Sequence, residues 1–111
     1  MKRGDIVLMA DRAGGDFAGK PRPAVIIQSD LFAATDSIVI CPITSQAAGD
    51  APIMRIALPA QPRTGLQKPS AIMVERMTSI RRDRIAKVVG RVSEDELLAL
   101  NRSLAVFLGF A

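Results

Sequence analysis

Two positions in the sequence carry side chains suited to binding a phosphate group. Arg22 lies between Pro21 and Pro23, which restrict the backbone on either side of it. Thr44, followed by Ser45, lies where an apolar segment meets a loop. A guanidinium can donate two parallel hydrogen bonds to a phosphate, and a hydroxyl can donate one. An ordinary surface arginine and a threonine that closes a local turn are the alternative interpretations.

Proton transfer in such a site depends on few groups, because the chain has no histidine. That absence excludes a histidine general base and a histidine-ligated metal. Asp16 or Glu75 could act as a base if its pKa is raised, and Arg22 or Lys20 could assist a leaving group. Cys41 is the only cysteine and lies in an apolar run, so we predict a small core residue rather than a nucleophile. We expect neither a metal nor a cofactor.

The chain is basic, with 15 lysines and arginines against 11 acids and a net charge of +4. The excess lies in residues 75–92, which predicts either a phosphate-binding surface or a solvated basic surface. Four phenylalanines are the only aromatic residues, so stacking of bases on the protein is not expected. The cations of this segment are Arg76, Arg81, Arg82, Arg84, Lys87 and Arg91.

Length and composition predict one domain over residues 1–111. Hydrophobic residues make up 49% of the chain, which is enough to form a core. No apolar run approaches the ~20 residues that a membrane helix needs, and no signal peptide is expected at the basic start. We therefore expect a cytoplasmic protein without membrane association.

Short apolar segments separated by glycine- and proline-containing loops predict a mainly β fold. We expect Pro42 at the edge or the end of its strand. Five or six antiparallel strands followed by a terminal helix are typical of a small curled barrel. The strands are expected over residues 5–10, 23–28, 37–43, 53–58, 70–77 and 87–92.

The helical signals are local and lie outside these strands. Ser93 and Glu96 have the spacing of a capping box, which predicts a helix over residues 94–108. Single helical turns are expected at residues 31–33 and 81–86.

Several motifs occur in a fixed order along the chain. They are KRGDI at residues 2–6, RPAVII at 22–27, PITSQ at 42–46, Val74-Glu75, and MTSI at 77–80. In this order and spacing they resemble the MazF/PemK (Kid) toxins of bacterial toxin–antitoxin systems, over essentially the whole chain.

The resemblance implies a CcdB/PemK-like, SH3-like barrel that forms a homodimer. It also implies a metal-independent, sequence-selective endoribonuclease that cleaves single-stranded mRNA and is inhibited by a cognate antitoxin protein. The positions that carry catalysis in the family match Arg22 and Thr44, and an acid near the end of the fifth strand matches Glu75. RNA contacts are predicted for Lys20, Ser45, Gln46, Arg76 and Arg81.

The chain departs from the family pattern at two places. Its first loop has Asp16 as its only acid, where many members have a Glu-Gln or His-Glu pair, and Met73 and Val74 stand where members often have an arginine. The identities of the general base and acid therefore stay open. Two other functions are compatible with the fold: a non-catalytic barrel toxin that inhibits DNA gyrase by binding it, and a small basic nucleic-acid-binding barrel.

Overall fold

The fold was obtained as a computed structural model that describes residues 1–10, 20–46 and 55–111. Within these ranges, seven strands form one antiparallel sheet and one α-helix follows them. The predicted mainly β fold with a C-terminal helix is confirmed. The strands are β1 (Asp5–Met9), β2 (Arg22–Ile26), β3 (Ser37–Thr44), β4 (Arg55–Leu58), β5 (Ser70–Met73), β6 (Thr78–Arg81) and β7 (Ile85–Arg91), and the helix is α1 (Glu94–Leu108).

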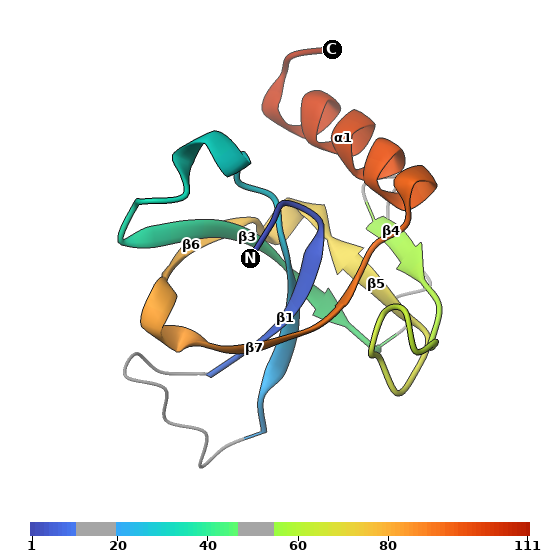
Figure 1. The fold of residues 1–111 in the computed structure, drawn as a ribbon. Helices are drawn as coiled ribbons and strands as arrows, with labels where there is room; N and C mark the ends of the chain where they lie inside the picture. Colours follow the sequence, from blue (N-terminus) through green and yellow to red (C-terminus); the bar gives the residue numbers. More distant parts are fainter. Residues whose placement is uncertain (11–19, 47–54) are drawn as a thin grey trace.

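The sheet curls but is not closed among the described residues (Figure 1). Its strands lie in the order β4-β5-β3-β2-β1-β7, and β6 pairs with β3 beside this path. The α1 helix packs against β4 at one side of the sheet (Figure 1). No helix of the described segments is long and apolar enough to cross a membrane.

The long strand β3 pairs with two different strands, β6 and β5, along the edge that faces away from β2. Its first half pairs with β6, from Ser37 opposite Arg81 to Ile40 opposite Thr78, and its last two residues pair with β5. Pro42 lies between these two stretches, where neither β5 nor β6 is in register with β3. Pro42 thus lies two residues before the end of β3 and pairs only with Ala24 of β2, and the break in the pairing on its other side accommodates a residue without an N–H.

The region after β5 differs from the sequence prediction. The strand expected over residues 70–77 stops at Met73, and a 3-10 turn, Val74–Arg76, follows it. The next residues form β6, which was not predicted as a strand, and the helical turn expected at 81–86 is the short 3-10 turn Arg82–Arg84. The predicted turn after Ser29 is confirmed as Asp30–Phe32, with the Ser29 side chain accepting the Leu31 N–H.

Alternating side chains of the central strands enter two apolar clusters, as the two-residue period of a strand requires. On β1, Ile6 joins one cluster and Val7 the other, and Val25 and Ala24 divide in the same way on β2. Cys41 is fully buried in the first cluster, and burial raises the pKa of its thiol to about 12. The prediction that Cys41 is a core residue is confirmed.

The predicted helix is confirmed with its bounds as α1. The Ser93 Oγ accepts the Glu96 N–H at 3.1 Å, and the Ser93 N–H donates to a Glu96 carboxylate oxygen at 2.8 Å. The helix ends at Gly109, whose φ of +86° suits a left-handed C-cap. The Glu96 carboxylate also pairs with Arg63 at 2.9 Å, which joins the loop after β4 to the start of the helix.

Candidate active site

Arg22 and Thr44 lie at the same end of the β2–β3 pair. Arg22 begins β2 and Thr44 ends β3, and the two strands are antiparallel. The last pair in register at this end is Ala24 opposite Pro42, so each of the two residues lies two positions beyond it. The alternation of side chains along a strand therefore gives both residues the same face of the sheet. A cation and a hydroxyl thus share one strand end and one face.

The neighbouring strands hold this end of the sheet on both sides. Met9 of β1 pairs with Arg22, and Ala71 of β5 pairs with Thr44. The Arg22 side chain is exposed, and Thr44 is half-buried. Three of the predicted RNA-contacting residues adjoin this strand end in sequence and are exposed: Lys20, Ser45 and Gln46.

The Thr44 hydroxyl takes part in a local turn. Its Oγ1 accepts the backbone N–H of Gln46 at 3.1 Å. The turn that the sequence left as an alternative therefore exists. It does not compete with phosphate binding, because a hydroxyl oxygen that accepts a hydrogen bond still has its own proton to donate.

Glu75 is paired with an arginine that the sequence analysis did not single out. Arg55 of β4 donates from its Nη2 to the Glu75 Oε2 at 2.8 Å and from its Nε to both carboxylate oxygens. The side chains of Arg55 and Glu75 are 15% and 23% exposed. Hydrogen bonding from Arg55 lowers the pKa of Glu75 below its ordinary value. The raised pKa that a base at Glu75 requires is therefore not present.

Glu75 also lies away from the strand end that holds Arg22 and Thr44. Ala71, the partner of Thr44, is near the start of β5, whereas Glu75 follows the opposite end of that strand. Arg55 pairs with Met73, so the register of β4 and β5 brings this guanidinium to the 3-10 turn. The sequence offered one indication of this pair: Arg55 lies in a predicted strand and Glu75 near the end of the next one. The two residues are 20 positions apart, so only the register of the two strands shows that they meet.

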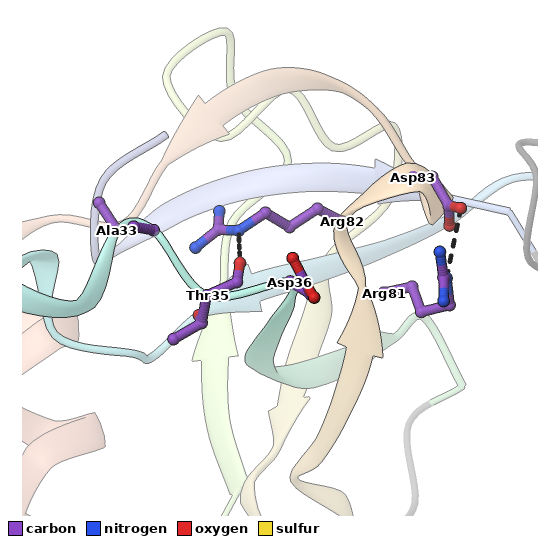
Figure 2. Close-up of a pocket in the computed structure, with 7 residues that line it drawn as sticks. Ala33, Thr35, Asp36, Arg81, Arg82 and Asp83 are labelled. Atoms are coloured by element: carbon purple, nitrogen blue, oxygen red, sulfur yellow. Dashed lines mark hydrogen bonds and ion pairs between the residues drawn. The ribbon is translucent and has the colours of Figure 1, made fainter.

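Arg81 lies at the other end of β3. It pairs with Ser37, seven residues before Thr44, which corresponds to about 20 Å along a strand. There it lines an open cavity of about 420 Å³ between the β2–β3 connection and the turn after β6. Figure 2 shows the Arg81 guanidinium turned toward Asp83, at 3.3 Å, and that of Arg82 turned the other way, toward the Thr35 carbonyl.

Half of the cations in residues 75–92 donate to other parts of the fold. The Arg82 Nε donates to the Thr35 carbonyl, and Arg84 donates twice to the carbonyl of Ala10, at 2.9 and 2.6 Å. Arg91 pairs with Asp5 at 2.7 Å. The segment is therefore not one continuous basic surface. Arg76 is exposed on the turn after β5, and the predicted candidate Asp16 lies outside the described residues.

Comparisons with known proteins identify relatives of this chain. The family model of the PemK-like, MazF-like toxin of type II toxin–antitoxin systems matches residues 2–108. A protein of Mycolicibacterium smegmatis named "Probable endoribonuclease MazF" is 42% identical over 111 residues, covering 100% of this chain and 99% of that protein. "Endoribonuclease MazF9" of Mycobacterium tuberculosis is 34% identical, over 97% of this chain and 96% of its own.

A solved structure shares the fold. The crystal structure of MazE–MazF from Deinococcus radiodurans superposes with a TM-score of 0.78 at 25% identity, covering 98% of this chain and 95% of that one. The family match spans nearly the whole sequence, and both sequence relatives align over nearly their full lengths. The chain belongs to the PemK-like, MazF-like toxins of type II toxin–antitoxin systems.

Proposed function

We propose that this toxin is a metal-independent endoribonuclease that cleaves single-stranded mRNA at selected sequences. The observation that carries the proposal is the placement of Arg22 and Thr44 at one strand end and on one face of the sheet. The names of the two sequence relatives, both endoribonucleases, support RNA cleavage over gyrase binding.

The proposed reaction begins with attack of a ribose 2′-oxygen on the adjacent phosphorus. The bond from phosphorus to the 5′-oxygen then breaks, which leaves a 2′,3′-cyclic phosphate and a free 5′-hydroxyl. Arg22 stabilises the additional negative charge of the pentavalent phosphorane, and the Thr44 hydroxyl donates to a non-bridging oxygen. Both groups act on the same phosphate.

Two protons also move in this reaction. One leaves the 2′-hydroxyl, and one reaches the departing 5′-oxygen. Glu75 is a weak acceptor, because Arg55 lowers its pKa, so Asp16 is the better candidate of the two predicted bases. Arg22 or Lys20 is the predicted group that assists the departure of the 5′-oxygen.

We propose that RNA first contacts the exposed residues beside the reacting phosphate, Lys20, Ser45 and Gln46. Arg76 and Arg81 are further predicted contacts. Arg81 would contact the RNA about 20 Å along β3 from Thr44. We further propose that residues 1–111 act as one domain in the cytoplasm, where the mRNA substrate is.

Two protein partners are part of the proposal. The related toxin of Deinococcus radiodurans is seen in a complex with MazE, and we propose that a cognate antitoxin inhibits this chain by covering the RNA site. We also propose a homodimer, in which the apolar side chains that α1 and its end expose are buried by a second copy. These are Leu98, Val106, Phe107, Leu108 and Phe110.

Incubation of the purified protein with single-stranded RNA in excess EDTA tests the proposal. Cleavage should persist and leave cyclic or 3′-phosphates, whereas DNA of the same sequence should resist because it lacks the 2′-hydroxyl. Loss of cleavage on chelation, or 5′-phosphate products, would contradict the mechanism. Growth arrest without any RNA cleavage would favour gyrase inhibition instead.

A further inference from the structure

The Thr44 hydroxyl differs from the hydroxyls of Thr35 and Thr64 in whether it donates a hydrogen bond within the protein. The Thr35 Oγ1 donates to the Ser37 carbonyl at 2.6 Å, and the Thr64 Oγ1 donates to the Pro59 carbonyl at 2.7 Å. Across residues 1–10, 20–46 and 55–111, no acceptor for the Thr44 proton is found. The Thr44 proton is therefore available to a ligand at this strand end.

The Thr44 Oγ1 also accepts a hydrogen bond from the backbone. It accepts the Gln46 N–H at 3.1 Å, so one of its two lone pairs is occupied by the backbone. This hydrogen bond restricts rotation of the half-buried Thr44 side chain, and it polarises the O–H bond toward donation. A backbone donor does this independently of the side chain at position 46.

We infer that the backbone N–H of Gln46 is a positioning group for the reaction, because it orients the Thr44 hydroxyl to donate its proton to the phosphate. The inference rests on the proposed ribonuclease function, and it assigns to position 46 a role that its side chain does not have. Thr44 contacts the phosphate, and the Gln46 amide acts through Thr44.

An amide-to-ester substitution at Gln46 tests this role, because it replaces the N–H by an oxygen and keeps the side chain. The chain can be assembled by ligation at Cys41, which lies five residues earlier in the sequence. A matched control exists, since the Leu66 N–H donates to the Thr64 Oγ1 at 3.3 Å with the same two-residue spacing. The reference is the all-amide chain prepared in the same way.

Two quantities are measured for each chain: the single-turnover cleavage rate of bound RNA, and the dissociation constant for RNA with a 2′-deoxy residue at the cleavage point. The Gln46 ester should cleave about threefold to tenfold more slowly, as expected for one lost hydrogen bond, with an unchanged dissociation constant. The Leu66 ester should cleave at the reference rate. In a Thr44→Val background the Gln46 ester should have no further effect, because its acceptor is gone.

The inference is overturned if the Gln46 ester cleaves at the reference rate, or if its loss of rate persists in the Thr44→Val background. It is also overturned if the ester weakens RNA binding and leaves the rate of bound RNA unchanged. Should the ester chain not fold, Gln46→Pro removes the same N–H together with the side chain, and Gln46→Ala, which removes the side chain and keeps the N–H, is its control. Gln46→Pro should then cleave bound RNA about threefold to tenfold more slowly than Gln46→Ala, and equal rates would overturn the inference. Failure of the reference chain itself to cleave RNA would instead contradict the proposed function, and the inference with it.

Discussion

Arg84 illustrates how a single guanidinium can stabilise this fold. Its Nε and Nη2 both donate to the carbonyl of Ala10, a residue that is 1% exposed, and the Ala10 N–H donates back to the Arg84 carbonyl at 2.8 Å. These bonds connect the end of β1 to the turn before β7. A buried carbonyl that loses a charged donor has no water to replace it.

Arg84→Ala should therefore lower the free energy of unfolding by about 1–2 kcal/mol, measured by urea denaturation. Lys87→Ala is the matched control, because Lys87 is an exposed cation of the same segment and its loss should change stability by less than about 0.5 kcal/mol. Equal effects of the two substitutions would show that Arg84 contributes only its charge.

The sequence could place the candidates Arg22 and Thr44 at strand ends from local motifs, and their proposed role came from the family resemblance. It could not distinguish Arg84 or Arg91 from RNA-binding cations. Their acceptors, Ala10 and Asp5, are 74 and 86 positions away. Charge counted along a segment does not indicate where each guanidinium points.

At the scale of the elements, the Arg55–Glu75 pair joins β4 to the 3-10 turn after β5. The pKa of Glu75 is lowered in the folded protein by its hydrogen bonds from Arg55. A carboxyl whose pKa is lower in the folded than in the unfolded chain contributes stability above its unfolded pKa. That contribution is lost as the pH falls through the folded pKa.

Glu75→Gln should lower the free energy of unfolding by about 1–2 kcal/mol above pH 5. The difference from the wild type should shrink as the pH falls below about 4, toward the lowered pKa of the folded state. Denaturation at several pH values measures this. In an Arg55→Gln background the same substitution should have little effect and lose this pH dependence. A difference that grows at low pH would contradict the assigned pair.

The elements differ in how far they could be predicted. The α1 helix follows from Ser93 and Glu96, which are three residues apart and cap the same turn. Strand β6 was missed because its pairing with residues 37–40 of β3 is a tertiary interaction that its own four residues do not encode. The Arg55–Glu75 pair was missed for a similar reason, since the register of β4 and β5 creates it.

At the scale of the whole molecule, the exposed apolar side chains of α1 predict a homodimer. Val106 is 54% exposed and Phe110 is 82% exposed, although both are apolar and lie at the same end of the helix. A chain of this size gains stability when such surface is buried in a symmetric pair.

Sedimentation at micromolar concentration should give a species of twice 11.9 kDa. Val106→Glu should shift the protein toward the monomer, because it places a charge in the proposed contact. Gln67→Glu, at an exposed polar position in the loop between β4 and β5, should leave the dimer unchanged. A wild type that sediments as a monomer would exclude the proposed homodimer under these conditions.

The single-turnover cleavage rate of Arg22→Ala, measured with single-stranded RNA in EDTA, tests whether Arg22 stabilises the phosphorane. Arg22 is exposed, so its loss should change the free energy of unfolding by no more than about 1 kcal/mol. The rate should fall on the order of 10²- to 10³-fold because a charge that stabilises the phosphorane is gone, and Arg22→Lys should restore little because a point charge lacks the paired donors. A folded Arg22→Ala variant that cleaves RNA at close to the wild-type rate would contradict the account.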